Sequence, residues 1–117
     1  MSSELLYVAR RDAYAAFLTA ADAESHVAWH RLDGRFVDGA AAVAAVDAAY
    51  AATRAAFNVI AVEGVGPVEE ARGALELLAA MHKDGGLAPD WKAFKVAREG
   101  FLVAAADFLR SSRDQAS

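Results

Sequence analysis

Three clusters of glycine and proline interrupt this chain of 117 residues, and they constrain its fold more than any other feature. They lie at 33–34 (Asp-Gly), 64–67 (Gly-Val-Gly-Pro) and 84–90 (Asp-Gly-Gly-Leu-Ala-Pro-Asp). Such residues favour turns and end helices. The segments between them have the length of long helices. We therefore predict helices at about 3–31, 38–63, 67–83 and 89–111, with 112–117 as a tail.

The composition supports helices over strands. Alanine occupies 31 positions, whereas proline occupies only 2, and alanine is a strong helix former that is depleted in strands. Long helices joined by short connections become antiparallel neighbours. The predicted fold is therefore all-α: a single domain over 1–117 that forms an antiparallel, up-down-up-down four-helix bundle.

The second segment has a regular apolar pattern between two capping signals. Asp38 is the expected N-cap and Gly64 the expected C-terminal stop. The stretch 57–62 could instead form a short strand, because β-branched residues gather there. The helical reading places one buried face at alternating spacings of three and four, at Val43, Val46, Tyr50, Thr53, Phe57 and Ile60.

The fourth segment carries phenylalanine at every seventh position, at Phe94, Phe101 and Phe108. Gly100 lies inside this pattern and costs about 1 kcal/mol relative to alanine in a helix, so we expect a neighbouring helix to approach closely there. Arg98 falls on or beside the same face. If it is buried, it needs a carboxylate or carbonyl partner, because an unpaired buried charge is very costly.

The first segment has a wide apolar sector that includes Tyr7, Tyr14 and Trp29. Such a sector indicates either deep burial between two helices or a contact surface for a partner. These three residues are therefore candidates for an interface, with packing at the core or its edge as the alternative.

One group of residues has the spacing of metal ligands. Asp22, His26 and His30 follow one another at intervals of four, so all three lie on one face of a helix. Histidine and carboxylate side chains bind divalent ions such as zinc. The glutamate of a His-Glu-x-x-His protease helix is missing. The alternative is a solvated polar face near a helix end.

Charge and composition argue against several classes of function. The net charge of −4 disfavours nucleic acid as a partner, since phosphate binding needs clustered basic residues. The chain has no cysteine, and no uncharged run approaches the roughly 18 residues of a membrane span. No spacing typical of catalytic groups occurs. We expect a cytoplasmic protein that is not an enzyme, needs no cofactor and does not bind membranes.

Three stretches carry a family resemblance. They are residues 10–18 (Arg-Arg-Asp-Ala-Tyr-Ala-Ala-Phe-Leu), 65–71 (Val-Gly-Pro-Val-Glu-Glu-Ala) and 94–102 (Phe-Lys-Val-Ala-Arg-Glu-Gly-Phe-Leu). In these the chain resembles small, alanine-rich helical proteins of unknown function from actinobacteria. The resemblance implies a helical fold and no catalytic activity.

The function most consistent with these patterns is a non-enzymatic protein-interaction module, whose partner is another protein or a second copy in a homodimer. The alternative is a bundle that binds a small molecule or a divalent metal through Asp22, His26 and His30.

Overall fold

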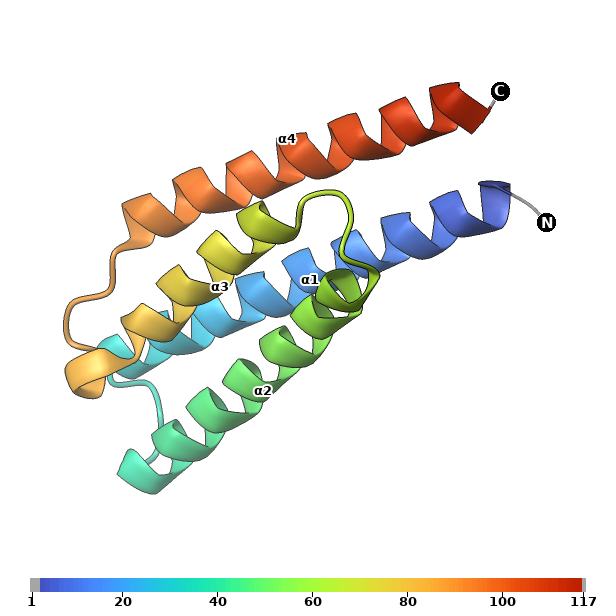
Figure 1. The fold of residues 1–117 in the computed structure, drawn as a ribbon. Coiled ribbons are helices and arrows are strands. Elements are labelled where there is room, and N and C mark those ends of the chain that lie inside the picture. The colour runs from blue at the N-terminus through green and yellow to red at the C-terminus, as the bar shows by residue number, and fades with distance from the viewer. Residues whose placement is uncertain (1–2, 117) are drawn as a thin grey trace.

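The computed structural model describes the backbone of residues 3–116 and the side chains up to residue 114. Consecutive helices run in opposite directions (Figure 1), and no strand occurs in residues 3–116. The predicted all-α antiparallel four-helix bundle is therefore confirmed, and the stretch 57–62 is helical. The elements are α1 (Ser3–Leu32), α2 (Gly39–Glu63), α3 (Val68–Met81), the short 3₁₀ helix η1 (Lys83–Gly86) and α4 (Trp91–Ala116).

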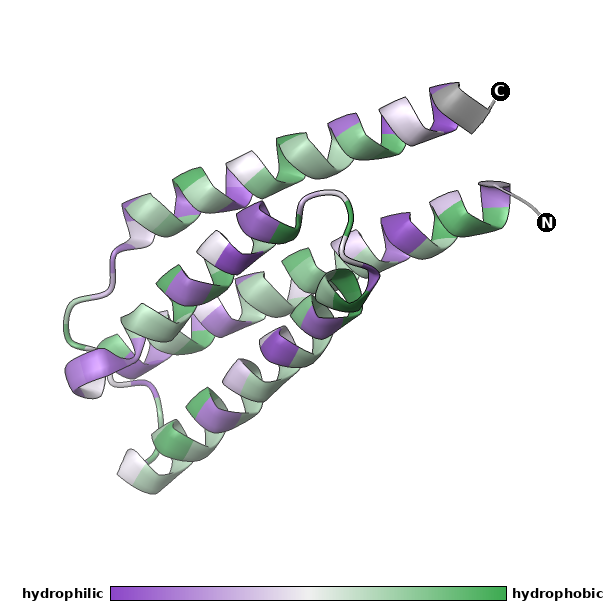
Figure 2. Ribbon diagram, viewed as in Figure 1, coloured by the Kyte–Doolittle hydropathy of each residue, from purple (hydrophilic) through white to green (hydrophobic). Residues whose placement is uncertain are grey.

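The four helices do not play equivalent roles in the bundle. Helices α1 and α3 each contact all three other helices, whereas α2 and α4 do not contact each other within the described chain. The molecule is elongated, with extents of 54 × 24 × 19 Å. Figure 2 shows hydrophobic residues on all four helices, with hydrophilic ones between them. The outer sides of α2 and α4 are consequently free of intramolecular packing along much of their length.

Local capping sets the ends of α2 as expected. The Asp38 carboxylate accepts a hydrogen bond from the Ala41 amide at 2.8 Å, which satisfies a free donor of the first turn. At the other end Gly64 has a φ of 71°, and its amide donates to the Ile60 carbonyl. This left-handed conformation is one that glycine adopts without steric cost.

Two predicted helix boundaries are wrong. Residues 112–116 belong to α4 rather than to a tail. No glycine or proline follows Gly100, and Arg113 near the helix end is held against Glu4 on α1. Helix α3 ends at Met81, two residues before the predicted end, because the chain turns sharply through η1 with positive φ at Asp84, Gly85 and Gly86.

The main core is aromatic and joins α1 to α4. Phe17 and Phe101 pack with ring centroids 5.0 Å apart, and the edge of Tyr14 meets Phe101 at 5.9 Å. Phe57 of α2 packs against Phe17. A second, smaller buried cluster lies toward the η1 end and contains Ala21, Ala28, Leu78, Met81 and Phe94.

The buried face of α2 is the predicted one at Val46, Thr53, Phe57 and Ile60, but the prediction is wrong at two positions. Val43 and Tyr50 are exposed. The Thr53 hydroxyl lies 3.0 Å from the Ala49 carbonyl and 3.2 Å from the Ala20 carbonyl of α1. The contact with the Ala20 carbonyl shows that α1 and α2 come close at this point. The buried positions are Ala42, Val46, Thr53, Phe57 and Ile60.

Candidate functional site

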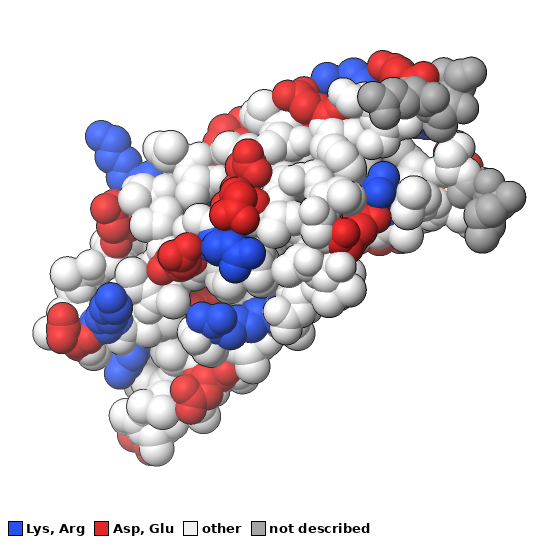
Figure 3. All heavy atoms as spheres, in the orientation of Figure 1, with Lys and Arg blue, Asp and Glu red and all other residues white. Residues whose placement is uncertain are grey.

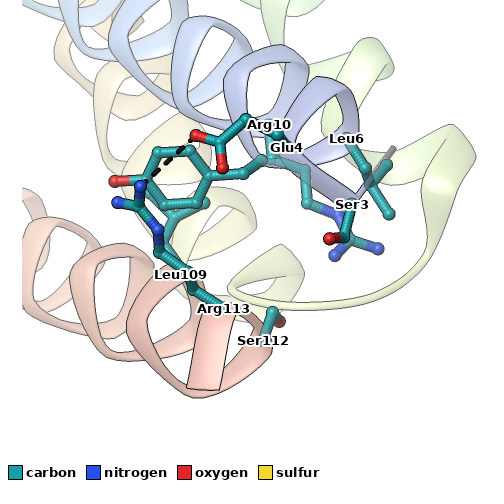
Figure 4. Close-up of a pocket in the computed structure, with 8 residues that line it drawn as sticks. Ser3, Glu4, Leu6, Arg10, Leu109, Ser112 and Arg113 are labelled. Atoms are coloured by element: carbon teal, nitrogen blue, oxygen red, sulfur yellow. Dashed lines mark hydrogen bonds and ion pairs between the residues drawn. The ribbon is translucent and has the colours of Figure 1, made fainter. Parts of the chain in front are cut away.

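A pocket of about 210 Å³ opens between the start of α1 and the end of α4 (Figure 4). Its polar lining includes two arginines, Arg10 and Arg113, which could in principle attract an anion. Its volume is below the roughly 300–1,000 Å³ of typical small-molecule sites. The complete lining is Ser3, Glu4, Leu6, Tyr7, Arg10, Leu109, Ser112 and Arg113.

Both arginines of this pocket already have carboxylate partners. Two guanidinium nitrogens of Arg10 lie 2.8 Å from one oxygen of Glu63, at the end of α2. Arg113 lies 3.3 Å from Glu4 and its guanidinium sits 4.6 Å from the centre of the Tyr7 ring. A guanidinium over an aromatic face is attractive. These contacts fasten α1, α2 and α4 to one another, so the pocket is best explained as a structural junction.

A buried pair of ionisable side chains, Glu24 and His82, lies at the opposite end of the bundle. His82 Nε2 and Glu24 Oε2 are 2.6 Å apart, and the Glu24 side chain is only 1% exposed. Glu24 Oε1 and His82 Nδ1 have no hydrogen-bond partner among the described residues. The pair links α1 to the residue that follows α3.

Sequence reasoning missed this pair, although a signal for Glu24 was present. Phe17, Ala21, Glu24 and Ala28 follow the spacing of one buried helix face. A glutamate on such a face predicts a buried partner, since an isolated buried carboxylate is very costly. The identity of the partner was not predictable, because His82 lies 58 residues away.

The structure does not assemble the predicted metal ligands. Asp22 forms a two-point ion pair with Arg98, with distances of 2.7 and 2.9 Å. This hydrogen bond raises the pKa of the Arg98 guanidinium above its usual value. His26 and His30 lie together, with ring centroids 4.2 Å apart. Within residues 3–114 no group of three potential ligands is placed to hold a metal ion. Metal binding by the two histidines stays a prediction.

The three aromatic residues proposed as an interface are separated by the fold. Tyr14 belongs to the buried core, so it cannot contact a partner. Tyr7 is half-buried beneath Arg113, and Trp29 is exposed with the Arg35 guanidinium 4.7 Å from its ring. The wide apolar sector of α1 reflects its central position among the other three helices, which was the alternative explanation.

The hydroxyl of Tyr14 has no hydrogen-bond partner within the described chain. It lies against the Gly66 turn, where an added Cβ would be 2.8 Å from the hydroxyl oxygen and 2.9 Å from the Phe108 ring. Burial raises the pKa of Tyr14 above its ordinary value of 10.0, and the negative charge of Glu63 acts in the same direction. The folded state therefore favours the neutral phenol.

This shift predicts a loss of stability in alkali that Tyr14→Phe removes. The contribution of the neutral phenol is complete below pH 10.0 and declines as the pH rises above it, because the unfolded chain loses the proton first. We expect urea midpoints of the wild type to fall more steeply above this pH than those of Tyr14→Phe. Equal slopes for the two proteins would contradict the assignment.

The outer side of α4 presents a row of residues that no other helix covers. Lys92, Val96, Gly100, Val103 and Asp107 form this row, which we call the α4 outer stripe. Val96 is 68% exposed and Val103 is 51% exposed. Apart from the chain neighbours of Gly100 and the backbone of its own helix turns, no described atom lies within 4 Å of the position that a Cβ on Gly100 would take. The expected approach of a neighbouring helix at Gly100 is thus not made by this chain.

Acidic and basic side chains are interspersed over the face seen in Figure 3. No helix within residues 3–116 has the length and apolar character needed to cross a membrane.

Comparisons with family models, with curated proteins and with solved structures yield no match.

Proposed function

We propose that this chain is a non-enzymatic protein-interaction module that binds a helix of a partner chain through the α4 outer stripe. The proposal rests mainly on one observation: two strongly exposed valines flank a helical glycine that has open space where a side chain would lie. Helical partners commonly dock on such apolar rows through residues spaced three and four apart. Full burial of a valine side chain contributes roughly 1.5–3 kcal/mol.

The ionisable residues at the other candidate sites support this proposal indirectly, because they already pair with one another within the chain. Arg10, Arg113 and Arg98 are each paired with a carboxylate, and Glu24 is enclosed with His82. These groups hold helices together. The α4 outer stripe, in contrast, has exposed apolar side chains that a docked helix would bury.

Photo-cross-linking tests whether the stripe is covered in the cell. A benzophenone amino acid at Val103 is expected to form a covalent adduct in the cells that produce the protein, because a docked helix would lie within its reach. The same probe at Val62, an exposed position on α2, serves as the matched control. Equal labelling at both positions, or none at Val103, would exclude the proposal.

A further inference from the structure

The order of residues along the α4 outer stripe suggests what its partner is. The spacings of four, four, three and four place Lys92, Val96, Gly100, Val103 and Asp107 along one side of the helix. The stripe begins with a cation, has apolar residues in its middle and ends with an anion. Its two charged ends, and its two valines, are therefore arranged symmetrically about the point between residues 99 and 100.

We propose that the α4 outer stripe binds a second copy of this chain, with the two α4 helices antiparallel. The inference rests on the proposed function and names its partner. A two-fold axis between residues 99 and 100 places Val96 opposite Val103 of the second copy, because both are equally far from the axis. The same axis places Lys92 opposite Asp107 of the second copy. Each contact occurs twice, as in any two-fold interface.

Gly100 supports this arrangement through its position beside the axis. Glycine costs about 1 kcal/mol in a helix interior, and the open space beside Gly100 shows that packing within the chain does not offset this cost. The distance between packed helices depends on the side chains at their contact. Two glycines at the centre of the interface let the backbones come close, so the four valines around them can pack against one another.

The charges specify the antiparallel direction. A parallel pair would place Lys92 beside Lys92 and Asp107 beside Asp107, which is unfavourable. Asp107 already accepts a hydrogen bond from Arg110 at 3.0 Å. Both groups are well exposed, so this pair is weak and leaves the second carboxylate oxygen for Lys92. In the proposed dimer, Glu99 also lies near Glu99 of the second copy, and these two negative charges repel each other. Lys95, one turn earlier on the same helix, offsets this repulsion.

Charge reversal tests the proposed register. Sedimentation over a range of concentrations should show a monomer–dimer equilibrium for the wild type. Lys92→Asp and Asp107→Lys are each expected to raise the dissociation constant by about tenfold or more, because two attractive contacts become repulsive. The double variant should return close to the wild-type value, since the opposite charges again face each other. Failure of the double variant to recover would overturn the register.

Gly100→Leu separates an effect on the interface from an effect on the fold. Leucine is a far better helix former than glycine, and the space around Gly100 is open, so the thermal midpoint of the monomer should rise. The dissociation constant should rise as well, because leucine side chains hold the two helices apart. A dimer of unchanged affinity in this variant would overturn the proposal.

The cross-link at Val103 distinguishes this inference from the proposed function. An adduct of twice the chain mass that disappears in Lys92→Asp supports self-association through α4. An adduct with a different protein, together with a wild type that stays monomeric at every concentration, would overturn the second-copy inference while the interaction function stands. Absence of any adduct would overturn both.

Discussion

Replacing Phe101 with alanine is expected to lower the free energy of unfolding by about 3–5 kcal/mol, the range for truncating a large core residue. Phe101 is 0% exposed, and its ring contacts those of Tyr14 and Phe17 on α1. The substitution therefore removes the main aromatic contact between α4 and α1. The cavity left by the substitution is bordered by the rings of Tyr14 and Phe17. Because these rings also pack against other residues, they cannot move far enough to fill the cavity.

Urea denaturation followed by circular dichroism measures this effect. Leu102→Ala is the matched control, because the neighbouring Leu102 is 39% exposed and does not belong to the buried cluster of Phe101. Its cost should stay well below that of Phe101→Ala. Similar losses for the two variants would mean that α4 packs on α1 through a different face.

Removal of His82 is expected to be nearly as damaging. His82→Ala removes the side chain that lies 2.6 Å from the buried carboxylate of Glu24, its one hydrogen-bond partner among the described residues. Loss of one partner of a buried pair typically costs about 3–5 kcal/mol, because the remaining charge must stay desolvated or the structure must open. We expect a clear drop in the thermal and urea midpoints. His26→Ala on the exposed side of α1 is the control and should change little.

A double substitution shows whether the cost comes from the orphaned carboxylate. In Glu24→Leu/His82→Leu both polar groups are replaced by apolar side chains, and such replacements of buried pairs are often nearly neutral. The double variant should therefore be more stable than His82→Ala alone. Additive losses from the two positions would indicate that the pair contributes mainly through packing rather than through its charges.

Much of the fold could be predicted because its signals are local. The Asp38 cap involves an amide only three residues away, and the Gly64 stop involves a carbonyl four residues away. Such contacts form within one helical turn and do not depend on the tertiary structure. The end of α4 was missed, although the absence of glycine and proline after Gly100 is itself a local signal for a longer helix.

The candidate sites were harder to predict, since they depend on partners far apart in the chain. Arg98 was expected to need a carboxylate or carbonyl partner if buried, but nothing in the sequence singled out Asp22, which lies 76 residues away. Asp22 was instead assigned to a metal site with its neighbours on the same helix. Local spacing identified residues that share a helix face, and it could not show which other helix that face meets.

The sequence by itself determined that this chain forms four helices and where most of them begin and end, because capping and helix propensity act over a few residues. The tertiary structure decided which neighbour each buried side meets and which of the apolar positions stay exposed. Alanine-rich faces differ little in hydrophobic area, so the rotation of each helix is set by contacts with its neighbours. Those contacts enclose Tyr14 and Glu24, turn Val43 and Tyr50 outward, and leave the α4 outer stripe free.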